Sequence, residues 1–208
     1  MNYLSPPEYE QYGIETATPE AWIGAASALM NAHCRRATLM AQQYVERIRI
    51  ASGRNTVLLT YLPMVSVPPA ASPIVSARAR FANPRRGESA ISDIANDAAR
   101  AFGLPGAWTN LIATDCDFDA MTGEVTLPMN VFGLSYNEVE ITYTAGVLAA
   151  NDELKFACAQ IVKNAQATPA LNVKSSTVEQ MKLEYFADSL VDSSVRRLLA
   201  PYVAQRMH

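Results

Sequence analysis

The sequence has few of the residues that commonly build catalytic or metal sites. Its 208 residues include two histidines, His33 and His208, and three cysteines, Cys34, Cys116 and Cys158, with no CxxC pair. An odd number of widely spaced cysteines supports neither a disulfide framework nor a zinc knuckle. We therefore expect all three to be small buried side chains in a protein made in a reducing compartment.

Long apolar runs and an excess of positive charge are also lacking. No apolar run reaches the roughly 18 residues that a membrane-spanning helix needs. The N-terminal residues have neither the basic nor the apolar region of a signal peptide. The net charge of −3 argues against broad nucleic-acid binding, which normally uses a basic face. Half of the residues are apolar, which is enough for a core, so we expect a soluble cytosolic domain that enters no membrane.

The common catalytic and nucleotide-binding motifs GxGxxG, Walker A, HExxH and GxSxG do not occur in the sequence. Residues 115–119 begin like a calcium loop, but Ala120 and Thr126 stand where that loop needs Gly and Glu. His33 and Cys34 are neighbours in an expected helix and point apart, so they do not make a base and a nucleophile. We predict no catalytic residue, no metal site, no cofactor and no enzymatic activity.

Two basic pairs and two tryptophans stand out as possible contact residues. The pairs at 85–86 and 196–197 are more typical of a solvated surface or an ion pair than of a phosphate site. Trp22 and Trp108 are more typical of core or interface anchors than of platforms for base stacking.

The clearest structural signal is a strand over residues 138–146 followed by a helix over residues 151–166. Val139, Ile141 and Tyr143 alternate with polar residues, which is the pattern of a half-buried strand. Asn151 or Asp152 can cap the helix that follows. One apolar stripe runs along that helix, which predicts that it faces a core; its residues are Leu154, Ala157, Cys158, Ile161, Val162 and Ala165.

The other segments alternate between helical and extended patterns. Capping signals predict a short helix over 5–12, a longer one over 18–36 and a last one from 192–193 to 202. Apolar spacing adds an inserted helix over 89–102. Period-2 patterns predict strands at 47–50, 55–61, 65–67 and 74–81, a hairpin of 113–118 with 124–127, and an extended arm over 173–186.

We therefore expect a single α+β domain over residues 1–208. The pattern favours a mainly helical bundle of about four helices, a β-rich insertion and an extended C-terminal arm. The helical core would consist of residues 1–46 and 147–208, and the insertion of residues 47–146.

Two segments, taken with the order of the elements, give the chain a likeness to a known family. They are Thr142-Tyr-Thr-Ala-Gly146 before the third helix and Leu198-Leu-Ala-Pro-Tyr202 near the end. With them, the chain resembles the head–tail connector (adaptor) family of long-tailed bacteriophages and prophages. The resemblance extends over nearly the whole chain. Residues 81–108 depart from it, being longer and more helical than the family leads us to expect between strands.

The resemblance implies a structural protein of the virion neck, assembled in the cytoplasm of the bacterial host. A ring of twelve copies would lie under the portal, bind a tail-side neck protein (a stopper or tail terminator) and let DNA pass without specific binding. The free protein could still be a monomer. Carried onto this sequence, the portal-docking candidates are Arg196, Arg197, Leu198, Leu199 and Tyr202. The candidates for an arm that reaches the neighbouring subunit are Val173, Val178, Met181, Leu183 and Tyr185.

Another neck protein, such as a stopper or tail-completion protein, is the alternative. The helical first third of the chain favours an adaptor over these mainly β-sheet proteins. An extended arm with one apolar edge suits strand addition to a neighbour, and a head-to-tail contact closes into a ring when its rotation permits.

Overall fold

The computed structural model describes residues 2–51, 53–82, 106–130, 133, 135–167, 175–178, 181–184 and 190–205. The chain forms two compact units. The helical unit consists of Met1–Leu39 and Ala149–Val203, and the sheet unit consists of Met40–Leu148 and Ala204–His208. The predicted helix over residues 89–102 lies outside the described residues.

The expected four-helix bundle is wrong. In the described part of the chain there are three α-helices and three antiparallel sheets, of four, three and two strands, and not a four-helix bundle. Where a short first helix was predicted, the chain makes two 3-10 turns, Pro6–Glu8 (η1) and Glu10–Tyr12 (η2), ended by Gly13 at a φ of 70°. The strands are also not an insertion into a helical bundle, because they enclose a hydrophobic core of their own.

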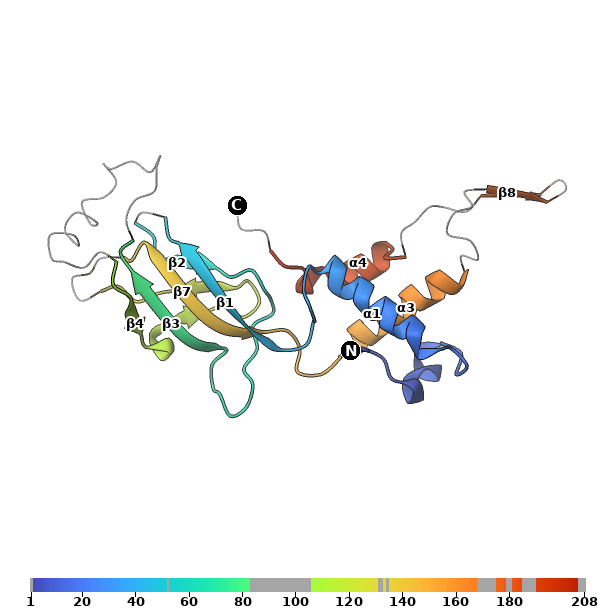
Figure 1. The fold of residues 1–208 in the computed structure, drawn as a ribbon, viewed down its shortest axis with the longest axis horizontal. Helices are drawn as coiled ribbons and strands as arrows, with labels where there is room; N and C mark the ends of the chain where they lie inside the picture. The colour runs from blue at the N-terminus through green and yellow to red at the C-terminus, as the bar shows by residue number, and fades with distance from the viewer. Residues whose placement is uncertain are drawn as a thin grey trace. The chain divides into compact units, whose positions relative to one another are not determined.

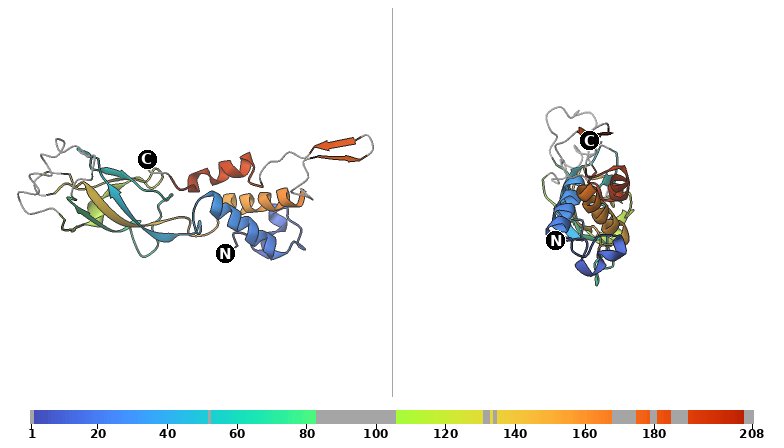
Figure 2. Two further views of the ribbon diagram at one scale, coloured as in Figure 1. Left: turned by 45° about the horizontal axis from the view of Figure 1, so that its top comes forward. Right: turned by 90° about the vertical axis from the view of Figure 1, so that its right-hand side faces the viewer.

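Three helices build the helical unit: α1 (Glu20–His33), α3 (Asp152–Ala167) and α4 (Ser193–Leu199). Figure 2 shows α1 in blue, α3 in orange and α4 in red, and α3 contacts both of the others. The predicted apolar stripe of α3 is confirmed, since Leu154, Cys158 and Ile161 are at most 1% exposed. Burying such side chains away from water is the main stabilising contribution in a core.

Polar contacts fix the N-terminus of α3 to the rest of its unit. Asn151 caps the helix by accepting a hydrogen bond from the Leu154 N–H (3.1 Å). The same side chain donates to the Tyr202 hydroxyl (3.0 Å). Lys155, one turn along, makes an ion pair with Glu8. These contacts join segments from both ends of the chain into one unit.

The first sheet of the sheet unit contains β1 (Gln42–Arg49), β7 (Glu138–Ala145), β3 (Ile74–Arg80) and β4 (Thr109–Leu111), in that order. The predicted strand around Val139 is thus confirmed, and Figure 1 shows β7 between β1 and β3. The second sheet has the order β2 (Thr56–Leu58), β6 (Glu124–Thr126) and β5 (Asp117–Phe118). β5 and β6 confirm the predicted hairpin around residues 119–123, but its first strand is shorter than predicted, because Ala113–Asp115 form a 3-10 turn.

The inward side chains of both sheets pack into one core. Val139, Ile141 and Val57 belong to it, with Val125 from β6. At one end, Tyr143 donates its hydroxyl to the carboxylate of Glu46, which also accepts from the Thr60 backbone N–H (3.2 Å). Because side chains alternate along a strand, the other face of each sheet points away from this core.

A separate two-stranded sheet, β8 (Ser175–Val178) with β9 (Met181–Glu184), lies in sequence between α3 and α4. The two strands are antiparallel, and Val178 pairs with Met181. The expected single extended arm is therefore a hairpin where it is described, because its two halves satisfy each other's backbone hydrogen bonds.

Candidate interaction surfaces

Four arginines and two glutamates form rows across the outer face of the four-stranded sheet. On the central strand, Glu138 and Glu140 each stand between one arginine of β1 and one of β3. The register pairs Glu138 with Arg49 and Arg80, and Glu140 with Arg47 and Arg78. The period of two brings all six side chains to one side of the sheet.

The carboxylate of Glu138 is the buried centre of this group. Its side chain is 1% exposed and accepts from Arg47 Nε (3.0 Å) and Arg80 Nε (2.5 Å), with Arg49 Nε at 3.5 Å. Burial pushes the pKa of Glu138 upward, but the hydrogen bonds from Arg47 and Arg80 outweigh it, so this pKa lies below its ordinary value. The carboxylate is therefore charged at neutral pH and holds three guanidinium groups in place.

Trp108 lies against the same arginines. The guanidinium carbons of Arg47, Arg78 and Arg80 are 5.3, 4.9 and 4.6 Å from its ring centroid. Arg80 also donates to the Gly106 carbonyl (3.4 Å), which fixes the segment that leads to the tryptophan. Each distance is short enough for a cation–π interaction. We call Trp108 and the six charged residues the arginine face; its four arginines and two glutamates leave two net positive charges.

The outer face of the three-stranded sheet has the opposite charge. A shallow hollow of about 280 Å³ is lined by Asp117, Asp119 and Glu124, together with Phe118 and Thr126. Hydrogen bonds from the backbone N–H groups of Met121 and Thr122 lower the pKa of Asp119, so it is charged at neutral pH. We call this the acidic hollow. In the described part of the chain, no group of three or more His, Cys, Asp or Glu side chains is arranged to hold a metal ion.

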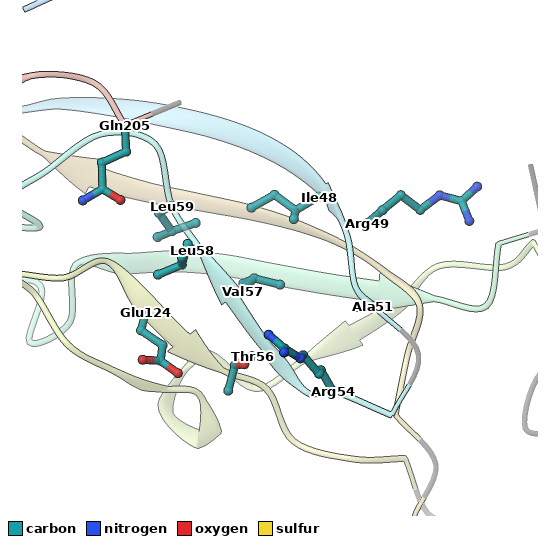
Figure 3. A pocket seen from close by; sticks show the side chains of 10 residues that line it. All are labelled: Ile48, Arg49, Ala51, Arg54, Thr56, Val57, Leu58, Leu59, Glu124 and Gln205. Carbon is teal, nitrogen blue, oxygen red and sulfur yellow. The ribbon is translucent and has the colours of Figure 1, made fainter. Parts of the chain in front are cut away.

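A larger pocket, of about 510 Å³, lies at the edge of the sheet unit between β1 and β2 (Figure 3). Its walls include the apolar Ile48, Val57 and Leu59 and the charged Arg54 and Glu124. In Figure 3 the guanidinium of Arg49 points away from the other lining side chains. The wall of the pocket is partly apolar and has charges of both signs. It is therefore better suited to binding a side chain of a partner protein than to catalysing a reaction.

The helical unit has an apolar groove between α1 and α3. It has a volume of about 280 Å³ and is lined by Trp22, Leu29, Ile161 and Leu190, with small residues between them. Trp22 is 41% exposed and Leu29 is 37% exposed. Exposed aromatic and aliphatic side chains around a groove are typical of a protein contact surface.

The predicted portal-docking residues divide into two groups. Leu199 and Tyr202 are buried in the helical unit, and the Tyr202 carbonyl accepts from the buried Arg36 (3.4 Å). Arg196 and Arg197 are exposed and Leu198 is half-buried. Of the predicted docking residues, those at 196–198 are therefore the ones that remain accessible when the helical unit is folded.

Of the predicted arm residues, Val173 and Tyr185 lie outside the described residues. Val178, Met181 and Leu183 are placed in the β8–β9 hairpin, where Leu183 pairs with Ser176. Arg47, Arg49, Arg78 and Arg80 lie in two segments that the sequence predicts to be strands, but the cluster that they form was not predicted. The signal was an Arg-x-Arg pattern in two strands and Glu-x-Glu in a third, and it becomes informative once the strand order is known.

Comparison with known proteins adds no relative: no protein-family model and no curated protein sequence matches the chain. Among the described residues, no helix is both long and apolar enough to span a membrane. The surfaces described above are therefore the basis for assigning a function.

Proposed function

We propose that this chain is a structural protein of a bacteriophage neck, an adaptor that forms a ring under the portal. The single observation that carries the proposal is the construction of the segment from α4 to Tyr202. Val195, Leu199 and Tyr202 anchor it in the helical unit, while Arg196 and Arg197 face outward. An anchored segment with exposed cations and one half-buried leucine is suited to docking on another protein.

The two segments that carry the family resemblance support the same proposal. Residues 142–146 complete the central strand of the larger sheet, and residues 198–202 close the helical unit. Both are structural parts of the fold, as expected for a protein whose role is assembly. The apolar groove beside Trp22 offers a further contact surface of the kind that a protein with several partners needs.

Charge reversal tests the docking segment better than truncation does. Removing the residues after 189 would take Val195, Leu199 and Tyr202 out of the core and unfold the helical unit. We expect Arg196→Glu with Arg197→Glu to weaken binding to the cognate portal at least tenfold and leave the melting temperature within a few degrees. Binding is measured by light scattering of the portal–protein mixture, with the stoichiometry read from the mass.

The matched control is Lys163→Glu, which reverses a charge in the same unit but beside Gly13 rather than on α4. It should bind the portal as the unaltered protein does. Portal binding that survives the double reversal would remove α4 from the interface. Absence of binding by the unaltered protein would contradict the adaptor proposal itself.

A stopper or tail-completion protein is the second candidate. The observation in its favour is the sheet unit, whose two packed antiparallel sheets occupy residues 40–148. A largely β-sheet protein was the pattern expected of those alternatives. The same scattering experiment separates the two, because only an adaptor adds about one copy to each portal subunit.

A further inference from the structure

We infer that the arginine face of one copy binds the acidic hollow of a second copy, and that this contact joins neighbours in the assembly. This inference rests on the proposed ring and adds to it the residues that form the contact between neighbours. Its starting point is the build of the sheet unit, in which two sheets share one core and so turn their outer faces in opposite directions.

The two faces have complementary charge. The arginine face has four guanidinium groups against two carboxylates, whereas the acidic hollow has three carboxylates from Asp117, Asp119 and Glu124. Arg78 and Arg47 are 46% and 50% exposed in the side chain, so each has donors available to a partner. Arginine and carboxylate form some of the strongest hydrogen-bonded pairs between proteins.

Each face also presents an apolar side chain beside its charges. Val45, on the outer side of β1 two residues before Arg47, is 64% exposed. Leu58, on the outer side of β2, pairs in register with Glu124 and is 53% exposed. When the arginine face of one copy meets the acidic hollow of the next, Val45 of the first copy and Leu58 of the second are both covered. The contact therefore removes apolar area from water in addition to pairing charges.

The arginine face is preformed. The buried carboxylate of Glu138 binds three of the four arginines. The ring of Trp108 also lies against three of the four. Their side chains therefore lose little conformational freedom when a partner binds, which favours affinity. Arginine and tryptophan are also the residues most enriched at the energetic centres of protein interfaces.

Duplex DNA is a weaker fit than a second copy. Glu138 and Glu140 lie among the arginines and reduce the net charge of the face to two. Phosphate binding draws its strength from uncompensated cations along the backbone, and the whole chain has a net charge of −3. A contact between two different faces of identical copies repeats head to tail, and closes into a ring when its rotation permits.

The test uses two full-length variants that each lose one face. The first, Asp117→Lys with Glu124→Lys, reverses the acidic hollow at exposed positions. The second, Arg78→Glu, reverses the charge of an exposed arginine of the arginine face whose ion pair is with Glu140, so it leaves the contacts of buried Glu138 in place. Glu10→Lys with Glu15→Lys is the matched control, because both of its positions are exposed in the helical unit. Circular dichroism and melting temperature establish that each variant folds.

Light scattering at low salt over a range of concentrations gives the average mass. We expect the unaltered protein and the control to associate, with the association constant falling about tenfold or more at high salt. Each face variant alone should remain a monomer. A mixture of the two should form a dimer and go no further, because only one intact face of each remains.

Three results would overturn the inference. They are an unaltered protein that stays monomeric, a face variant that associates as the unaltered protein does, or a mixture that forms no dimer. Duplex DNA is added to the same samples to test the alternative ligand. If the unaltered protein binds DNA and Arg78→Glu is the only variant that loses this binding, the arginine face is a nucleic-acid site. Portal binding is measured in the same samples to separate the two proposals. If the protein binds the portal but does not self-associate through these faces, the adaptor proposal stands and only the proposed interface is wrong.

Discussion

Arg47 holds the carboxylate of Glu138 with two nearly parallel hydrogen bonds, Nε to Oε1 at 3.0 Å and Nη2 to Oε2 at 3.1 Å. This bidentate pair joins β1 to the central strand, and Arg80 binds the same carboxylate from the other side. Three of the four predictions below test contacts in which a charged side chain joins strands, sheets or segments that are distant in the sequence.

Glu138→Gln should destabilise the sheet unit by about 3 kcal/mol, the usual cost of removing one partner from a buried ion pair. The arginines would remain beside a neutral amide, whose N–H₂ group cannot accept their hydrogen bonds. Urea unfolding measures the change. Glu140→Gln is the control, because Glu140 is 22% exposed and its loss should cost less than 1 kcal/mol. Equal losses for the two variants would contradict the role of Glu138 as the buried centre.

Tyr143→Phe should destabilise the protein by about 1–3 kcal/mol, because its hydroxyl is a buried hydrogen-bonding group. That hydroxyl accepts from the Tyr61 backbone N–H (3.0 Å) and donates to Glu46. Burial, followed by the hydrogen bond to Glu46, raises the pKa of Tyr143. Absorbance titration should show Tyr143 ionising only when the protein unfolds in alkali, and ionisation within the folded state would count against the contact.

Glu8→Gln should lower stability at neutral pH, and the difference should disappear in acid. The hydrogen bond from Lys155, followed by those from Ser5, lowers the pKa of Glu8 to about 2 from 4.5. A carboxyl whose pKa is lower in the folded state stabilises the fold above its ordinary pKa and loses that contribution as the pH falls. The gap in unfolding free energy should therefore shrink from pH 4.5 downward and vanish near pH 2. A constant gap would assign the effect to packing.

The three cysteines should resist thiol reagents until the protein unfolds. All three are free and buried, and burial raises the pKa of Cys34 and of Cys158 to about 11. Burial also raises the pKa of Cys116. Because the thiolate is the reactive form, a colorimetric thiol assay should detect almost none in native protein and three per chain in denaturant. Fast labelling of one cysteine in native protein would show that its unit opens locally.

The sequence predicted elements whose signals are local. The alternation around Val139 and Tyr143, the stripe from Leu154 and the cap at Asn151 each depend on near neighbours in the chain, and all three are observed. The fold class was wrong because the pairing of the short strands β2, β5 and β6 depends on segments that are distant in the sequence. The sequence patterns placed extended segments at these positions, but a period of two does not show which strands pair, so a second sheet with a shared core was not predicted.

The interaction surfaces depend on contacts between distant segments. Arg47 and Glu138 come together only through the pairing of β1 with β7. Leu199 and Tyr202 were predicted to dock to the portal, but apolar residues of a helix can equally face a core, because the sequence does not identify what covers them. The structure places Leu199 and Tyr202 in the core, and the portal-docking assignment stays a prediction for the remaining side of α4.

The interleaved order of the two units has a consequence for synthesis on the ribosome. The first helix, α1, packs against α3, which is made only after residues 40–148 of the sheet unit. Domains tend to fold as units while the chain emerges. The two sheets can therefore form while α1 still has no partner, and the helical unit is completed only after α3 and α4 have been made. A chaperone that shields the apolar side of α1 during this interval would raise the yield of folded protein, and slower translation after residue 148 would not.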